Sequence, residues 1–193
     1  MREADPHAEC GGLYGVVRDE SVLLVIDVQE RLLPAMNDPR MVVEHSGMLL
    51  QAATELAVPI MVSEQYPKGL GLTVSPLREL AAGGRIFEKM AFSCADEADI
   101  IKHLRSLGRR QLVLCGIEAH VCVLQTALGL RREGYDVFVA EDAISSRASE
   151  NMAAGRRRMA ANNIEMVSTE MVIFEWLQVA GTPEFKTLSK LIK

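Results

Sequence analysis

Apolar residues form six short, nearly uninterrupted runs along the chain, and stretches with helical spacing separate these runs. The runs are Ser21 to Val28, Pro59 to Gln65, Gly84 to Lys89, Gln111 to Ile117, Tyr135 to Ala143 and Ile164 to Thr169. Strands that are apolar at consecutive positions are typical of a parallel sheet covered by helices on both faces. The pattern therefore predicts an α/β fold, a three-layer α/β/α sandwich around a six-stranded, mainly parallel sheet.

The stretches between these runs place apolar residues three or four positions apart, as an amphipathic helix does. They are Met41 to Ala57, Asp96 to Leu107, Ala119 to Glu133, Ser149 to Asn162 and Glu170 to Val179, with a short turn at Pro76 to Ala82 and a final helix in TPEFKTLSKLIK. Residues 1–20 show no clear period, so we expect an N-terminal arm over 1–20 and a single domain over 21–193.

Charge and composition narrow the class of protein. The net charge of −5 gives no reason to expect a nucleic-acid or anionic-membrane partner, since either would favour a basic face. The sequence has neither a membrane-spanning run nor a signal-peptide pattern, which predicts a cytoplasmic protein. The four cysteines show no C-x-x-C spacing, so each is expected to be a thiol. Cys115, within a strand, is expected to be packing, and Cys10 to have no chemical role.

Three residues with reactive or ionisable side chains lie at or just after the ends of different strands of the predicted sheet. Asp27 lies one residue before the end of the first run, Lys89 ends the third, and Cys122 follows the fourth. Ligands of open parallel sheets bind beyond the carboxyl ends of the strands, so these side chains are expected to meet in one crevice. Each also has a structural interpretation: Asp27 as a cap, Lys89 as a surface lysine and Cys122 as core packing.

Together the three residues supply what acyl transfer through a thioester requires. A helix N-terminus lowers the pKa of a thiol, which favours Cys122 as a nucleophile. The Asp27 carboxylate can take the thiol proton, and the Lys89 ammonium offsets the negative charge. Backbone N–H groups at the same turn can receive the oxyanion. The substrate is then a small molecule with a carbonyl-type carbon.

The segments LLVIDVQ, FEKMAFS and LCGIEAHVCVLQTALGLRREGYDVFVAEDA resemble the signature blocks of the isochorismatase-like cysteine hydrolases. SEQYPKGLG and the C-terminal segment resemble the branch of isochorismatase domain-containing proteins. The resemblance implies that Asp27 is the general base, Lys89 the cation and Cys122 the nucleophile. It also implies a cis peptide bond between Ile117 and Glu118, and an oxyanion hole from the N–H groups of Glu118 and Cys122. Relatives commonly form homo-oligomers, so one is expected here.

The sequence departs from the nicotinamidases of this family at the place where they bind a metal. The corresponding stretch, EQYPKGLGL, contains no histidine, so we expect neither a metal nor another cofactor, and nicotinamide becomes a weaker substrate candidate. His120 with Cys122 and Cys94 is a poor zinc set, because it would occupy the nucleophile. Residues that follow the strand ends are candidates for the substrate pocket: Gln29, Leu32, Tyr66 and Phe92.

Three other functions remain open from the residues alone. One is vinyl ether hydrolysis of the isochorismatase type, which needs no cysteine nucleophile. Another is a binding or scaffold module with a silent triad, and the third is a redox sensor, because a low-pKa thiol oxidises readily. A dinucleotide-binding domain is not expected, since DVQERLLP stands where a glycine-rich phosphate loop would be needed.

Overall fold

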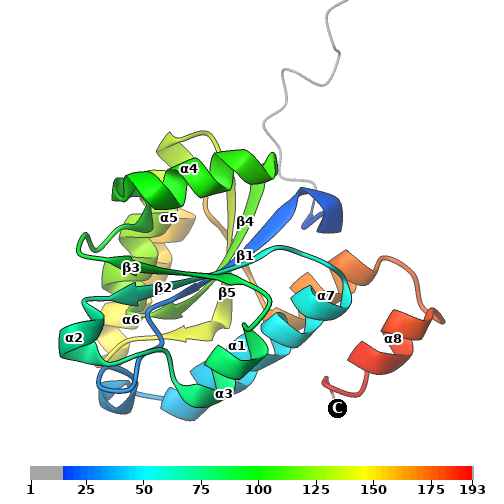
Figure 1. Cartoon of the computed structure of the whole chain (residues 1–193), viewed down its shortest axis with the longest axis horizontal. Helices are drawn as coiled ribbons and strands as arrows, with labels where there is room; N and C mark the ends of the chain where they lie inside the picture. The colour runs from blue at the N-terminus through cyan, green and yellow to red at the C-terminus, as the bar shows by residue number, and fades with distance from the viewer. Residues whose placement is uncertain (1–14, 193) are drawn as a thin grey trace, which may run out of the picture.

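The computed structural model describes residues 15–192, so most of the expected N-terminal arm, including Cys10, lies outside the described residues. Six strands form one sheet: β1 (Ser21–Ile26), β2 (Ile60–Gln65), β3 (Arg85–Lys89), β4 (Gln111–Ile117), β5 (Asp136–Ser145) and β6 (Glu165–Val167). Their order is β3-β2-β1-β4-β5-β6, and every neighbouring pair is parallel. The predicted three-layer α/β/α fold is confirmed (Figure 1).

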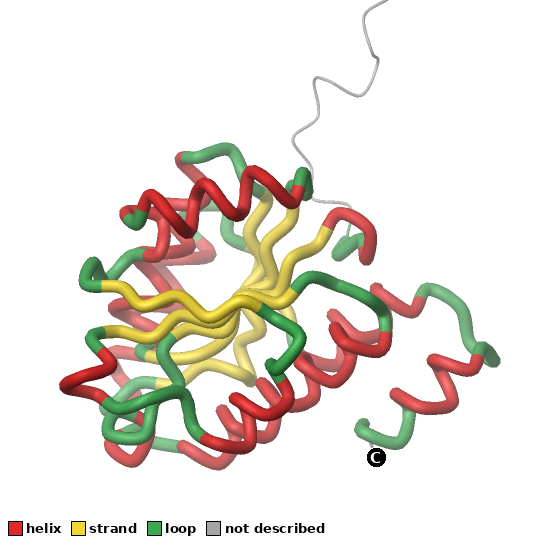
Figure 2. Tube along the Cα trace, viewed as in Figure 1, coloured by secondary structure: helices red, strands yellow, loops and turns green. Residues whose placement is uncertain are grey.

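Helices cover both faces of this sheet (Figures 1 and 2). On one face lie α1 (Pro39–Glu55), α3 (Ser75–Leu80), α7 (Thr169–Leu177) and α8 (Pro183–Leu188); on the other lie α4 (Ala98–Leu107), α5 (Leu124–Arg132) and α6 (Ser149–Ala160). Short helical turns occur at Arg18–Glu20, Leu33–Ala35, α2 (Pro67–Leu70), Cys94–Asp96 and Ala119–Val123. None of the helices within residues 15–192 combines the length and apolar character needed to cross a bilayer.

The alternation of side chains along β1 explains why its run is apolar at every position. Leu23 and Val25 pack into the core beneath α1, whereas Leu24 and Ile26 pack into the core beneath α4 and α5. Each face of a strand takes every second residue, so a strand buried on both faces is apolar at most of its positions. The strand ends at Ile26 because Asp27 adopts a φ of 54°, outside the range of a strand.

Several elements differ in detail from the sequence expectation. The turn expected at Pro76 to Ala82 is the helix α3, and the strand expected at Tyr135 to Ala143 continues to Ser145 as β5. The helix expected from Ala119 begins with a π-helical turn, Ala119–Val123, and becomes α-helical only at Leu124. The described end of the expected arm packs on the body: Val16 is buried in the core beneath α1.

Candidate active site

Asp27 lies at the carboxyl end of β1, fully buried, in a left-handed backbone conformation with φ 54°. Its N–H donates to the carbonyl of Ser63 on β2, and the hydroxyl of Ser63 donates to Asp27 Oδ1 at 2.7 Å. Such a conformation is unfavourable for a residue with a Cβ and is kept where surrounding contacts enforce it. Contacts with β2 thus fix the direction of the carboxylate.

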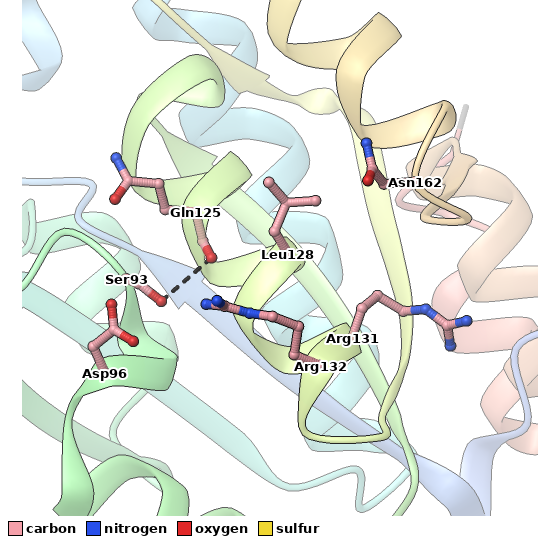
Figure 3. Close-up of a pocket in the computed structure, with 7 residues that line it drawn as sticks. All are labelled: Ser93, Asp96, Gln125, Leu128, Arg131, Arg132 and Asn162. Atoms are coloured by element: carbon pink, nitrogen blue, oxygen red, sulfur yellow. Dashed lines mark hydrogen bonds between the residues drawn. The ribbon is translucent and has the colours of Figure 1, made fainter.

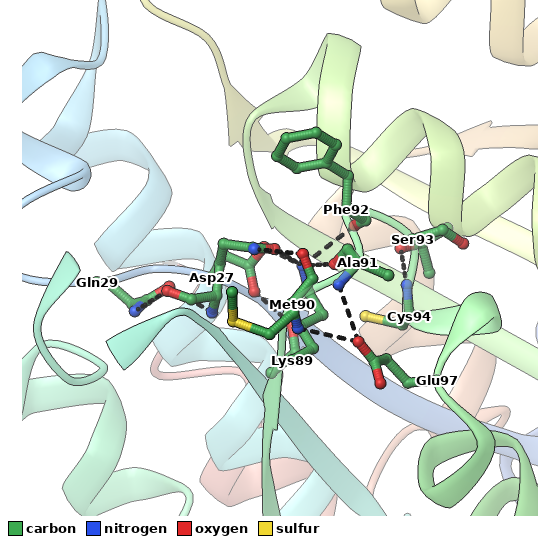
Figure 4. Close-up of polar contacts among 12 residues, drawn as sticks. Asp27, Gln29, Lys89, Met90, Ala91, Phe92, Ser93, Cys94 and Glu97 are labelled. Carbon is green, nitrogen blue, oxygen red and sulfur yellow. Dashed lines mark hydrogen bonds and ion pairs between the residues drawn. The ribbon is translucent and has the colours of Figure 1, made fainter. Parts of the chain in front are cut away.

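Lys89 ends β3, and its ammonium group lies beside this carboxylate. Lys89 Nζ is 2.7 Å from Asp27 Oδ2, with both side chains completely buried. The ammonium also donates to Gln65 Oε1 at 2.7 Å and to the carbonyls of Ala91 and Phe92 at 3.2 and 3.1 Å. Figure 4 shows Asp27, Ala91 and Phe92 around Lys89. A buried charge is tolerated when it is paired and hydrogen-bonded, and Lys89 meets both conditions.

Burial raises the pKa of the Asp27 carboxyl, although Lys89, Ser63 and Cys122 favour the carboxylate and offset part of this effect. Burial by itself lowers the pKa of Lys89. The negative charge of Asp27, with smaller contributions from Cys94 and Cys122, raises this pKa by more, so it lies above its usual value. A carboxylate with a raised pKa is a stronger proton acceptor than an exposed one. Asp27 is therefore suited to accept a proton.

Cys122 reaches the same place from the other side of β1, through the turn that follows β4. The turn starts at Gly116, whose φ is 119° and where a Cβ atom would stand 2.0 Å from the Ile26 carbonyl oxygen. The Ile117–Glu118 peptide bond is cis. The π-helical turn that follows carries Cys122, which is 5% exposed and close enough to Asp27 for each to affect the pKa of the other.

The pKa of Cys122 moves in the direction opposite to the sequence expectation. Burial, followed by the nearby Asp27 carboxylate, raises the pKa of the thiol above its ordinary value, and Lys89 lowers it only in part. The expected lowering at a helix N-terminus was wrong, because burial and a neighbouring negative charge outweigh the helix dipole. At rest Cys122 is a neutral thiol, so it must lose its proton as it attacks.

Glu118 and His120 attach this turn to the loop after β5. The Glu118 carboxylate accepts from the backbone N–H of Arg147 at 3.0 Å and from Arg147 Nε at 3.1 Å. His120 Nδ1 lies 2.9 Å from the Ser146 hydroxyl. Two side chains on either side of Ala119 are thus held by neighbouring residues of one loop, which fixes the turn that presents Cys122.

The four residues expected in the substrate pocket have different environments. Gln29 is fully buried, and its amide bonds the backbone of Gln65 and Gly71, so it clamps loops together and does not form a wall. Leu32 packs against the core beneath α1. Tyr66 and Phe92 are 47% and 55% exposed. In Figure 4 the Phe92 ring projects away from the polar cluster. The structure leaves Tyr66 and Phe92 available to a ligand.

Two surface depressions lie near these elements. One of about 290 Å³ adjoins Lys89 and is lined by Tyr66, Pro67, Lys68, Glu88, Lys89, Met90 and Glu97. A larger one of about 440 Å³ (Figure 3) lies between α5, the end of α6 and the Cys94–Asp96 turn; its lining includes Arg131 and Arg132 but none of Asp27, Lys89 and Cys122. Because Lys89 lines the first depression, that depression is the better candidate for substrate contact.

Sequence reasoning missed the residues that support the triad. Ser63 is buried within the run Pro59 to Gln65, and Gln65 is the last residue of that run. Cys94 is fully buried, and Asp27 and Lys89 both affect its pKa, which burial raises to about 11. Within residues 15–192, no three His, Cys, Asp or Glu side chains are grouped so as to hold a metal ion. His120 instead bonds Ser146.

Comparison with known proteins gives consistent matches. The family model described as the isochorismatase domain matches residues 21–171. The secreted isochorismatase effector Isc1 of Phytophthora sojae is 40% identical over 183 residues, covering 92% of this chain and 87% of that protein. Isochorismatase domain-containing protein 2 of Danio rerio is 38% identical, with 89% and 86% covered. The solved structure of MAR1 ribonuclease from Caenorhabditis elegans superposes with a TM-score of 0.87 at 35% identity, covering 92% of both chains.

Proposed function

Since the chain belongs to the isochorismatase family of hydrolases, we propose that it hydrolyses a small amide or related carbonyl compound through a thioester on Cys122. The observation that carries this proposal is the meeting of Asp27, Lys89 and Cys122 at one edge of the sheet, with a buried Asp27–Lys89 pair beside the thiol. A nucleophile, a base that can activate it and a fixed cation are the groups that acyl transfer needs.

The proposed reaction begins with attack of Cys122 Sγ on the carbonyl carbon. Because the thiol is neutral at rest, its proton passes to the Asp27 carboxylate as the C–S bond forms. The carbonyl oxygen becomes negative and is received by the N–H groups of Glu118 and Cys122. The C–N bond then breaks, the leaving amine takes the proton from Asp27, and the acyl group remains on Cys122 as a thioester.

Water completes the cycle. Asp27 takes a proton from a water molecule as that water attacks the thioester, and the proton is returned to the Cys122 sulfur when the C–S bond breaks. The products are a carboxylic acid and the restored thiol. Lys89 remains an ammonium throughout, since its acceptors hold it charged. Tyr66 and Phe92 are proposed to contact the substrate, because both are exposed beside these strand ends.

The raised pKa of Cys122 also bears on the alternatives. A redox sensor needs a thiolate at neutral pH, and burial disfavours that form here. Vinyl ether hydrolysis would require Asp27 as a proton donor and would leave Cys122 without a role. A silent binding module would leave the whole triad unused. Neither alternative uses the thiol.

The test measures turnover of a panel of simple amides, N-carbamoyl compounds and isochorismate, with RNA included because the nematode relative is named a ribonuclease. Wild type is compared with Cys122→Ala and with Cys115→Ala, a matched variant of a fully buried thiol in β4. We expect Cys122→Ala to abolish turnover and Cys115→Ala to retain it. An acyl adduct on Cys122, detected by mass spectrometry after rapid quenching, would identify the thioester.

Two outcomes would contradict the proposal. Isochorismate turnover that survives in Cys122→Ala would assign the protein to vinyl ether hydrolysis. Binding of panel compounds without turnover by wild type, measured by calorimetry, would assign it to a binding module.

We also propose that the protein forms a homo-oligomer. Met171, Phe174 and Val179 expose 48%, 42% and 62% of their surface along α7 and the segment after it. Exposed apolar side chains grouped in this way are typical of interfaces. Light scattering on the purified chain tests this, and a monomer at micromolar concentration would refute it.

A further inference from the structure

Gln65 joins the ammonium of Lys89 to the backbone beyond it. It is the last residue of β2 and is 8% exposed. Its Oε1 accepts from Lys89 Nζ at 2.7 Å, and its Nε2 donates to the Met90 carbonyl at 2.9 Å. One side chain thus contacts both the tip of Lys89 and the main chain directly after it.

The orientation of this amide is determined by its two partners. An ammonium can only donate hydrogen bonds and a carbonyl can only accept them, so the amide oxygen must face Lys89 and the nitrogen must face Met90. The backbone of Gln65 is fixed as well, because its N–H donates to Gln29 Oε1 at 2.8 Å and its carbonyl accepts from Gln29 Nε2 at 3.0 Å. Gln65 is therefore a rigid acceptor.

A neutral amide suits position 65 better than a carboxylate such as that of the neighbouring Glu64. Glu64 points to the opposite face of β2, where its carboxylate accepts from Thr73 and from Arg78. A carboxylate in place of Gln65 would put a second negative charge beside Asp27. The neutral amide supplies an acceptor without competing with Asp27 for the ammonium.

We infer that Gln65 is a positioning residue, which holds the Lys89 ammonium against Asp27 and so keeps Asp27 aligned with Cys122. The role of the alignment in turnover rests on the proposed function, whereas the holding of Lys89 does not. A lysine side chain has four flexible bonds and binds water strongly when free. In this buried site its position depends on its acceptors, and Gln65 is its only side-chain acceptor besides Asp27 among the described residues.

The test follows the exchange of the Lys89 ammonium hydrogens by NMR at neutral pH. The chain has six lysines, so the Lys89 signal can be assigned from its loss in Lys89→Arg. Gln65→Met preserves the size of the side chain but removes the acceptor oxygen. In Gln65→Met we expect the Lys89 ammonium hydrogens to exchange with water about tenfold faster or more, because one charge-assisted hydrogen bond is lost. Gln65→Glu keeps an acceptor and should keep slow exchange.

Gln111→Met is the matched control. Gln111 is also 8% exposed, but it starts β4 at the opposite end of the sheet, where its side chain bonds Val17 and Gly15. Exchange at Lys89 should not change in this variant. If Gln65→Met fails to fold, Gln65→Asn replaces it, because the shorter side chain withdraws the oxygen from Lys89. Unchanged exchange in a folded Gln65→Met or Gln65→Asn would overturn the inference.

Turnover separates this inference from the proposed function. Where a substrate is found, Gln65→Met should lower kcat with little change in KM. Gln65→Glu should also lower kcat, because its carboxylate competes with Asp27 for the ammonium. Faster Lys89 exchange in a protein that hydrolyses nothing on the panel would support the positioning role and refute the proposed function. Unchanged Lys89 exchange in Gln65→Met, together with turnover that depends on Cys122, would refute the positioning role and support the proposed function.

Discussion

The Lys89 ammonium lies 2.7 Å from the Asp27 carboxylate, and neither side chain is exposed to solvent. Removing one partner of such a pair leaves a buried charge without compensation, which typically costs about 3–5 kcal/mol. We therefore expect Asp27→Asn and Lys89→Met each to lower the free energy of unfolding by about this amount. The double variant should lose less than the sum of the two, as measured by urea unfolding.

An exposed ion pair provides the control for this cycle. Arg105 and Glu133 lie 2.7 Å apart with side chains 68% and 37% exposed, and such pairs contribute about 0–1 kcal/mol. Single substitutions there should be nearly neutral. Strictly additive losses for Asp27→Asn and Lys89→Met would show that the two charges do not stabilise each other.

Gly116→Ala is expected to be severely destabilising. The added Cβ would lie 2.0 Å from the Ile26 carbonyl oxygen on the adjacent strand, and the φ of 119° is itself unfavourable for alanine. Backbone cannot yield as a flexible side chain can, so we expect a loss of at least about 4 kcal/mol or failure to fold. Thermal unfolding of both variants tests this, and Gly83→Ala, where nothing lies within 4 Å of the added Cβ, should be close to neutral.

The free energy of unfolding should fall as the pH rises above 9.0, the ordinary pKa of a cysteine thiol. Burial raises the pKa of Cys94 to about 11 and that of Cys115 to about 12, from an ordinary value of 9.0. At a pH between 9.0 and the raised pKa of each cysteine, the thiol has lost its proton in the unfolded chain but keeps it in the folded chain. Ionisation of the thiol therefore favours unfolding. Each group contributes a slope of about 1.4 kcal/mol per pH unit.

Cys115→Ala isolates one of these contributions. Its absolute stability should be lower because packing is lost, but the decline of its unfolding free energy between about pH 9.5 and 10.5 should be shallower by one thiol. Urea titrations at several pH values measure the slope. A slope equal to that of wild type would mean that Cys115 does not ionise on unfolding in this range.

Turnover should not depend on a divalent metal. The proposed chemistry uses the thiol, the carboxylate and backbone N–H groups, and within residues 15–192 no cluster of metal-ligating side chains is present. Dialysis against EDTA is expected to leave kcat unchanged, with a zinc hydrolase treated in parallel as the control. Loss of activity that added zinc restores would contradict the proposed mechanism.

The architecture could be predicted because runs such as Ser21 to Val28 carry a one-dimensional signal. A strand buried on both faces is apolar at most of its positions, and parallel pairing then places Asp27 and Lys89 at the same edge. The direction of the Cys122 pKa shift could not be predicted, since it depends on how completely the surrounding chain excludes water. The role of Gln65 could not be predicted either, because it depends on Lys89 and Met90, which lie at the end of a different strand.

The strand order has a consequence for how the protein acquires its activity. Asp27 follows β1, Lys89 ends β3 and Cys122 follows β4. These strands lie within the contiguous array β3-β2-β1-β4, and β2 supplies Ser63 and Gln65. No local segment contains a working subset, so docking of distant strands must be complete before the site exists. Recovery of turnover during refolding therefore reports the finished sheet, whereas far-ultraviolet circular dichroism reports helices that can form earlier.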